Sequence, residues 1–202
     1  MIEANWHPDI PDDCVPLRDV NGHPVYRPGY EPSKAVRKQM AEKYLVKLHQ
    51  KIHDMIVAGA IFLFDGHSTV SARGVSDNQI DLMNFQHSNI DPEPRVFCPD
   101  ILVETYASEL GKRLPGINVT VNASEYYKVY GHVCSAHTIN SFKRCYDKVP
   151  GLIQETNERL YKNSDRTPNI TAINRLRTEF AESLKATLAI ISTYQETRTH
   201  HD

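Results

Sequence analysis

The sequence lacks the long hydrophobic runs and the charge excess that mark membrane proteins and nucleic-acid-binding proteins. Among its 202 residues, no apolar stretch approaches the roughly 20 residues that a membrane helix needs. Lysine and arginine number 23 and aspartate and glutamate 25, so the formal net charge is only -2. The first residues are polar and acidic, without the apolar core of a signal peptide. We therefore expect a cytoplasmic protein with no nucleic-acid or membrane partner.

Cysteine is scarce, and several common catalytic motifs are missing. The four cysteines, Cys14, Cys98, Cys134 and Cys145, form no C-x-x-C pair, and we expect free thiols in a reducing compartment. No P-loop, G-x-G-x-x-G, G-x-S-x-G or H-E-x-x-H occurs. These absences argue against a nucleotide-binding protein, a serine hydrolase and a common zinc protease.

What is present fits one globular domain. Hydrophobic residues make up 40% of the chain and charged residues 24%, which are ordinary values for such a domain. The length suits a single hydrophobic core. We expect one domain over residues 1–202, in which residues 1–32, rich in proline, aspartate and glycine, form an irregular N-terminal segment.

Hydrophobic periodicity predicts three helices. The clearest one begins after Ser33 as N-cap, reaches about Val57 and ends at Gly59. The others cover residues 99–114 and roughly 171–193. The apolar stripe of the first helix consists of Val36, Met40, Tyr44, Leu48, Ile52 and Ile56, widened by Ala41, Leu45 and Met55. The inner face of the last helix consists of Ile173, Leu176, Phe180, Leu184, Leu188 and Ile191.

Strand patterns lie between these helices. Residues 60–64 are typical of a strand buried on both faces, and residues 117–121 alternate as a half-buried strand does. Residues 151–161 begin as a short strand and leave as an irregular segment, whereas residues 71–100 read as a loop with room for one short strand. Residues 125–148 fit neither pattern clearly. The order predicts an α/β fold, a three-layer sandwich with a mixed, largely parallel sheet.

Polar residues follow two of the predicted strands, where open α/β sheets bind ligands. The segment Asp65-Gly66-His67-Ser68 follows the first strand, and Glu155 follows a short apolar run. A neutral His67 would suit a metal there, with Asp65 orienting the imidazole and Ser68 capping a turn or contacting a substrate. Glu155 would suit a general base beside that metal. The alternative is a simple turn with a surface histidine and a salt-bridged glutamate.

Other histidines are weaker candidates. His49 lies at the edge of the first helix's apolar stripe, one turn before His53, where packing or capping is the alternative role. His132 and His137 flank Cys134, which suggests a metal or oxyanion site, but their spacing matches no standard zinc pattern.

Four segments in this order resemble the N-formylglutamate amidohydrolase family. They are "PVYRPGYEPS" (24–33), "YLVKLHQKI" (44–52), "IFLFDGHS" (61–68) and "LIQETNERLY" (152–161). Two positions depart from the family pattern: Leu48 stands where a tyrosine is usual, and Gln154 is shifted by one position. Together the segments extend the resemblance over most of the chain.

The resemblance implies a zinc carboxypeptidase-like (phosphorylase/hydrolase-like) fold. It also implies the hydrolysis of N-formyl-L-glutamate to formate and glutamate, a deformylase step in amino-acid catabolism such as histidine degradation. His67 would bind one Zn²⁺ per chain, and Glu155 would accept a proton from the zinc-bound water, whose pKa zinc lowers to about 7. The residues expected around the metal or the substrate are Asp65, Ser68, His49, His132, His137 and Arg159.

Two departures leave alternatives open. The family draws its other metal ligands from a region before residue 27, and we expect this chain to lack that region. The few residues there provide only His7, Asp9, Asp12 and Asp13. The family also has an arginine before the glutamate signature, and here its substitutes would be His132, His137, Lys143 or Arg144. A shortened non-catalytic relative that binds a small ligand or a partner is the alternative. An exposed sheet edge would favour a homo-oligomer.

Overall fold

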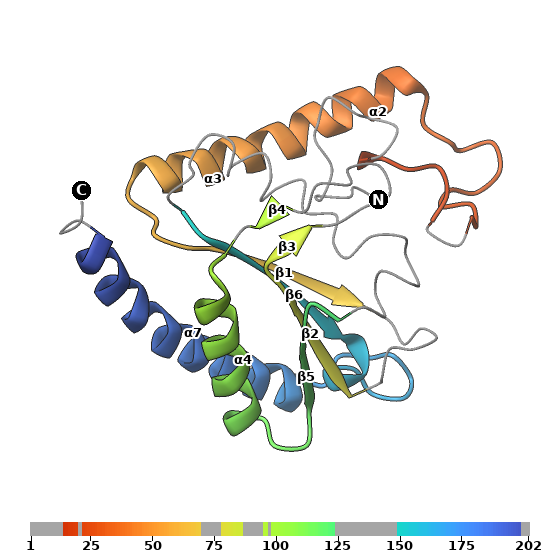
Figure 1. Cartoon of the computed structure of the whole chain (residues 1–202). Helices are drawn as coiled ribbons and strands as arrows, with labels where there is room; N and C mark the ends of the chain where they lie inside the picture. Colours follow the sequence, from red (N-terminus) through yellow and green to blue (C-terminus); the bar gives the residue numbers. More distant parts are fainter. Residues whose placement is uncertain are drawn as a thin grey trace. The chain divides into compact units, whose positions relative to one another are not determined.

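The computed structural model describes residues 14–19, 22–69, 78–86, 95–96, 98–123 and 149–198. These residues fall into two compact units (Figure 1). The first contains the described residues up to Ile61 together with Val149, and the second contains those from Phe62 to 123 and from Pro150 to 198. No helix in the described part is long and apolar enough to cross a membrane. The single domain stays a prediction.

The first unit is built on the predicted long helix, which has three segments. They are α2 (Lys34–Ala41), the π-helical η1 (Glu42–Val46) and α3 (Lys47–Val57). Ser33 caps the start by accepting a backbone hydrogen bond from the first turn. Gly59 follows the end with φ +100°, a conformation that favours glycine. Both boundaries are confirmed.

The predicted apolar stripe of this helix is only partly correct. Ala41, Leu45 and Ile56 are buried, whereas Val36, Tyr44, Leu48 and Met55 are exposed. The π segment contains Tyr44, and its i→i+5 hydrogen bonds put more residues in a turn than an α-helix does, which interrupts the four-residue spacing there.

The second unit contains a four-stranded sheet in the order β1-β6-β2-β5. β1 pairs with β6 and β2 with β5 in parallel, and β2 pairs with β6 antiparallel, so the predicted mixed, largely parallel sheet is confirmed. Its strands are β1 (Leu63–Thr69), β2 (Gln79–Met83), β5 (Asn118–Val121) and β6 (Gly151–Asn157). A separate two-stranded sheet joins β3 (Phe85–Gln86) and β4 (Arg95–Val96).

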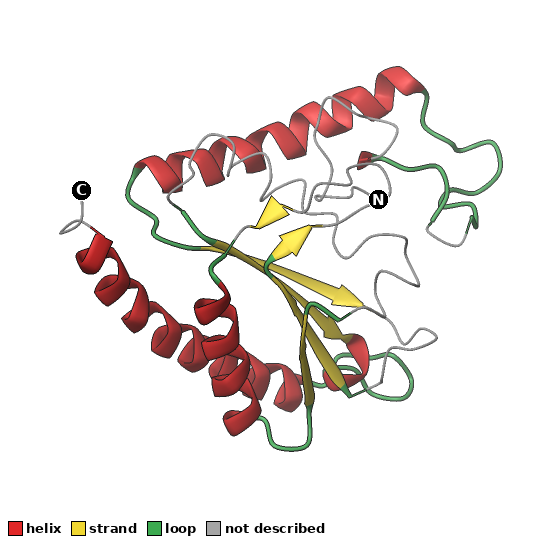
Figure 2. Cartoon of the chain, in the orientation of Figure 1, coloured by secondary structure: helices red, strands yellow, loops and turns green. Residues whose placement is uncertain are grey.

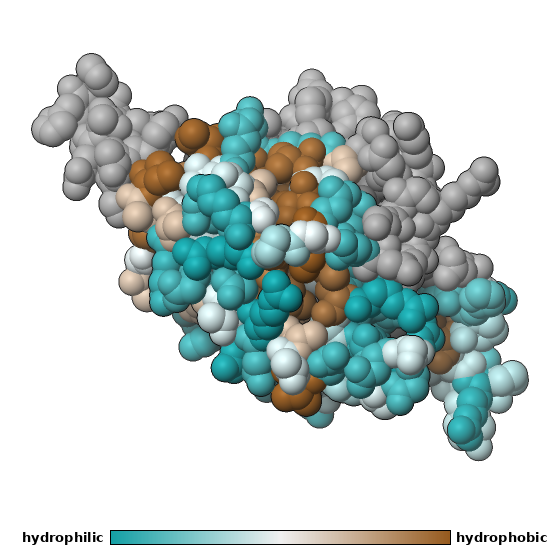
Figure 3. Space-filling model, turned by 90° about the horizontal axis from the view of Figure 1, so that it is seen from below, coloured by the Kyte–Doolittle hydropathy of each residue, from teal (hydrophilic) through white to brown (hydrophobic). Residues whose placement is uncertain are grey.

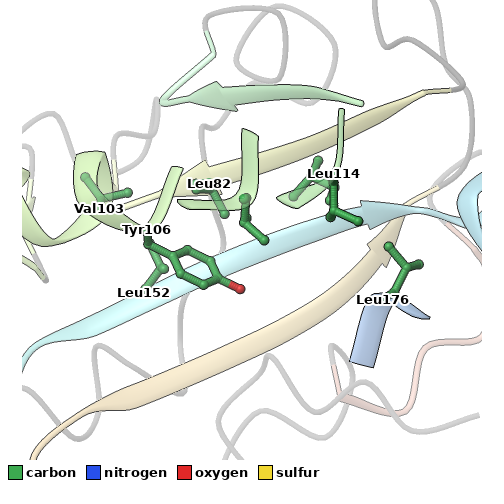
Figure 4. Close-up of a cluster of buried hydrophobic side chains, with 8 residues drawn as sticks. Leu82, Val103, Tyr106, Leu114, Leu152 and Leu176 are labelled. Atoms are coloured by element: carbon green, nitrogen blue, oxygen red, sulfur yellow. The ribbon is translucent and has the colours of Figure 1, made fainter. Parts of the chain in front are cut away.

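Two helices pack together on one side of the four-stranded sheet (Figure 2). They are α4 (Asp100–Arg113) and α7 (Ile170–Arg198), and a single 3-10 turn, η2 (Glu158–Leu160), follows β6. The core between helices and sheet consists of Ile80, Leu82, Val103, Tyr106, Leu110, Leu114, Leu152 and Leu176 (Figure 4). Both predicted helices and the α/β class are confirmed. The surface seen in Figure 3 is mostly hydrophilic, with smaller hydrophobic areas between.

The first predicted strand has the wrong boundaries. It begins at Leu63 and continues through Asp65-Gly66-His67-Ser68 to Thr69, because the parallel ladder with β6 covers all seven residues. Ladder hydrogen bonds and packing override the low β-propensity of aspartate and glycine. Residues of this edge strand alternate between half-buried and exposed up to Ser68, so the expected burial on both faces is also wrong.

Asn84 joins the ends of three elements. Its Nδ2 donates to the Cys98 carbonyl at 2.8 Å and to Asp100 Oδ1 at 2.7 Å, and its Oδ1 accepts from Asn122 Nδ2 at 2.7 Å. The side chain therefore links the end of β2, the end of β5 and the first turn of α4. Cys98 is buried, as is Cys14, and their redox state stays a prediction. Cys134 and Cys145 lie outside the described residues.

The helix side of β6 contains one buried polar network. The Tyr106 hydroxyl donates to Gln154 Oε1 at 2.8 Å, and Gln154 Nε2 donates to Thr156 Oγ1 at 3.0 Å. Burial raises the pKa of Tyr106 well above its usual range, so the hydroxyl keeps its proton and acts as the donor.

Tyr106→Phe tests this network. The change leaves the amide oxygen of Gln154 buried without its donor, so we expect a loss of about 1–3 kcal/mol in the free energy of unfolding in urea. Tyr30→Phe is the control, because Tyr30 is 78% exposed and should change stability by less than about 0.5 kcal/mol. Equal stabilities of the two variants would contradict the assignment.

Candidate functional site

The pairing of β1 with β6 brings His67 directly opposite Glu155. Neighbouring strands lie about 4.8 Å apart, and residues in register in a parallel pair point to the same face of the sheet. Leu152 in β6 packs toward the helices. Side chains alternate along a strand, so Ile153 and Glu155 face the other side of the sheet, away from α4 and α7. The two main predicted residues therefore lie side by side, although within their strands and not beyond the strand ends.

A row of four side chains crosses the whole sheet at this level. Asp81 in β2 is the register partner of Glu155 on its other side, and Thr120 in β5 is the register partner of Asp81. The row therefore reads His67, Glu155, Asp81, Thr120. It combines an imidazole, two carboxylates and a hydroxyl on one face.

Asp81 is fully buried and anchored on one oxygen. Gln79 Nε2 donates to its Oδ1 at 2.5 Å, and the Thr120 hydroxyl donates to the same oxygen. Sequence reasoning missed this residue because it fell in a stretch expected to be a loop. The available signal was a lone carboxylate inside an apolar run, with Ile80 before it and Leu82 after it.

Asp65 contacts the imidazole of His67. The two residues are two positions apart in β1 and point to the same face, and Asp65 Oδ1 lies 3.0 Å from His67 Nε2. Both side chains are mostly buried, with 24% and 18% of their surface exposed. The predicted contact between them is therefore present. Asp65 Oδ2 is buried and makes no hydrogen bond within the described part of the chain.

The surroundings of Glu155 raise the pKa of its carboxyl to about 7. Burial is the largest cause, and the negative charges of Asp81 and Asp65 act in the same direction, while His67 opposes them. A carboxyl that titrates near neutral pH is suited to accept and return a proton. Such a shift is frequent at functional sites, although buried ion-pair networks also produce it.

The other predicted site residues are placed differently. Ser68 belongs to the face opposite to His67, because successive side chains in β1 alternate, so its position does not support the predicted substrate contact. Arg159 is exposed in η2, just after the end of β6. His49 lies in α3, in the first unit, and its role stays a prediction. The candidates outside the described residues are His7, Asp9, Asp12, Asp13, His132, His137, Lys143 and Arg144.

The described residues do not complete a zinc site. Imidazole and carboxylate groups are suitable donors for zinc, and catalytic sites normally use three protein ligands. In the described part of the chain, however, no three histidine, cysteine, aspartate or glutamate side chains are arranged to hold one ion. Nε2 of His67 faces Asp65. Zinc therefore stays a prediction, and no step below is derived through it.

Comparison with known proteins identifies the fold. No model of a protein family and no curated protein matches the sequence. The structure of N-formylglutamate amidohydrolase from Ralstonia eutropha JMP134 is similar with a TM-score of 0.59 and 17% identity, covering 87% of this chain and 62% of that one. A gene product from Agrobacterium tumefaciens has a TM-score of 0.53 and 15% identity, covering 92% of this chain and 67% of that one.

At these identities the likeness establishes the fold alone. The fold implied by the four sequence segments is confirmed, since this chain shares the fold of an N-formylglutamate amidohydrolase. The chain spans less than two thirds of the length of that enzyme, 62%.

The raised pKa of Glu155 predicts that stability falls with pH. Between its usual value of 4.5 and about 7, the unfolded chain has lost this proton while the folded chain keeps it, so folding is favoured at the acid end. The free energy of unfolding should fall across this window by on the order of 3 kcal/mol and level off above it. Unfolding in urea at pH 5 and pH 8 measures the change.

Glu155→Gln removes this titration and should flatten that part of the profile. Glu104→Gln, on the exposed side of α4, is the control and should keep the wild-type slope. A Glu155→Gln variant with an unchanged slope would show that Glu155 titrates as an ordinary surface carboxyl.

Proposed function

We propose that this chain hydrolyses the amide bond of an N-acyl amino acid, with N-formyl-L-glutamate as the first substrate to test. The fold shared with an N-formylglutamate amidohydrolase supports the substrate class. The observation that carries the proposal is the half-buried Glu155 directly opposite His67, with a pKa of about 7. The setting that the resemblance implies is cytoplasmic amino-acid catabolism.

Glu155 is the general base in this proposal. Its ionised carboxylate takes a proton from a water molecule while the water oxygen bonds to the formyl carbon. The carbon–nitrogen bond then breaks, and the proton held by Glu155 passes to the leaving nitrogen, which yields formate and the free amino acid. A pKa near the working pH suits both halves of this transfer, because the same group must take up and release the proton.

Asp81 and His67 act on Glu155 from opposite sides. Asp81 is held by Gln79 and Thr120, so its charge stays fixed beside Glu155 and favours the protonated form. His67 favours the ionised form. The balance between these neighbours, within a buried environment, sets the proton affinity that the proposed base requires.

His67 is also the zinc ligand that the family resemblance implies. In that role it would be one of about three protein ligands, and the ion would supply Lewis-acid activation of the amide carbonyl. At least one further ligand would come from outside the described residues, because these contain no group of three suitable side chains.

A second candidate function is a small-ligand-binding module that keeps the sheet face without catalysis. The observation that favours it is the incomplete set of metal ligands in the described part of the chain. The two candidates differ in metal content and in turnover, so two measurements separate them.

Glu155→Gln should abolish hydrolysis while the protein stays folded. We expect formate release from N-formyl-L-glutamate to fall by at least about 100-fold, because the amide cannot accept the proton of water. Glu104→Gln serves as the matched control and should retain activity. Full activity in Glu155→Gln would remove Glu155 from the role of base, and a wild-type protein without activity would favour the binding module.

Elemental analysis of the purified chain tests the metal. The amidohydrolase proposal expects close to one zinc per chain, and His67→Ala should lower that content. His23→Ala is the control. The His23 side chain is 74% exposed and contacts Asp19, and both residues are distant from β1 in the sequence, so this change should leave the zinc content unchanged. An absence of zinc in the wild-type protein, or an unchanged content in His67→Ala, would overturn the metal assignment.

A further inference from the structure

The outer edge of β1 is open in the described part of the chain. β1 is the terminal strand of the four-stranded sheet. The Leu63 amide donates to the Pro150 carbonyl at 2.9 Å, toward β6. Because backbone groups of successive strand residues point to opposite sides, those of Phe64, Gly66 and Ser68 point away from β6.

No hydrogen bond from the described residues reaches these outward groups. Gly66 and Ser68 are exposed, and Phe64 is 37% exposed. An unpaired row of amides and carbonyls on a strand of seven residues is a template for another strand. The remaining question is which strand fits it.

The sequence of β1 is complementary to itself in one antiparallel register. Gly66 is its central residue, and a two-fold axis at Gly66 pairs all seven residues with those of a second copy. Asp65 then lies opposite the partner's His67, and Phe64 lies opposite the partner's Ser68. The carboxylate and the imidazole meet in a non-hydrogen-bonded pair, where facing side chains approach most closely.

Neighbouring registers are less favourable. An axis at Asp65 would place two carboxylates directly opposite each other, and like charges in that position are destabilising. An axis at His67 would oppose two imidazoles and leave the start of each strand unpaired. Only the register centred on Gly66 gives an acid–imidazole pair on each side of the axis.

We propose that two copies of this chain associate through the edges of their β1 strands, antiparallel and centred on Gly66, into one continuous sheet. The row of side chains at the candidate site then continues across the interface, because His67 has Glu155 on one side and the partner's Asp65 on the other. The second copy thus contributes a carboxylate to each site. The inference rests on the geometry of β1 and does not require the proposed hydrolysis.

Ser68→Pro and Ser68→Ala form a matched pair for testing the interface. Proline removes the outward amide of residue 68 and is tolerated on a strand edge that faces solvent, whereas alanine removes only the side chain. By sedimentation, the wild-type chain and Ser68→Ala should have twice the 23.0 kDa of one chain, and Ser68→Pro should be a monomer. A monomeric wild type over the whole concentration range, or a dimeric Ser68→Pro, would overturn the proposal.

Disulfide cross-linking tests the register and does not depend on the folding of the proline variant. In Gly66→Cys the two Cα atoms would lie about 5.5 Å apart, within the range that a disulfide spans. In Ser68→Cys the two thiols would be separated by about 14 Å along the strands. We expect mild oxidation to link Gly66→Cys and to leave Ser68→Cys at the level of the native chain. Equal cross-linking in both variants would contradict the register.

Discussion

The parallel pairing of β1 with β6 is the constraint on which the candidate site depends. It places His67 beside Glu155, and a slip of one residue would turn Asp65 and His67 toward the helices. Contacts on the helix side hold the register. The Phe64 ring packs edge-on against Tyr106 with centroids 6.0 Å apart, and Tyr106 bonds to Gln154 in β6. The hydrophobic side of the sheet therefore fixes the geometry of the polar side.

The charged side chains on the polar side of the sheet destabilise the folded protein. Glu155 is largely buried between two strands, and the carboxylate of Asp81 stands opposite it. Burial and the charge of Asp81 disfavour ionisation of the Glu155 carboxyl. An apolar residue at position 81 or 155 would remove the repulsion between the two carboxylates. Sites that retain unfavourable buried charge commonly do so for function at some cost in stability. This conflict, together with the fixed position of Asp81, is the strongest physical reason to look for chemistry on this face.

Regular periodicity made much of the fold predictable. Ser33, Gly59 and the spacing in α4 and α7 were sufficient for the helices, and the acid–imidazole segment and Glu155 were recognisable as candidates. The order of strands in the sheet was not predictable, so Asp81 and Thr120 could not be connected with Glu155. The end of β1 was also misplaced, because Asp65 and Gly66 are poor strand formers that only the ladder with β6 retains. The glutamine that is shifted by one position from the family pattern is Gln154. It faces the helices and accepts a hydrogen bond from Tyr106, so it does not lie on the same face as Glu155.

The hydrogen bonds of Asn84 have a consequence for local motion. Helix ends usually fray, since their first amides lack partners within the helix. Here the first residue of α4, Asp100, is bound to Asn84, and Asn84 is bound to Asn122 after β5. Opening the first turn of α4 therefore requires the ends of both strands to give way with it. Amide protons of these three segments should accordingly exchange with solvent as one cooperative group, slower than an ordinary helix start.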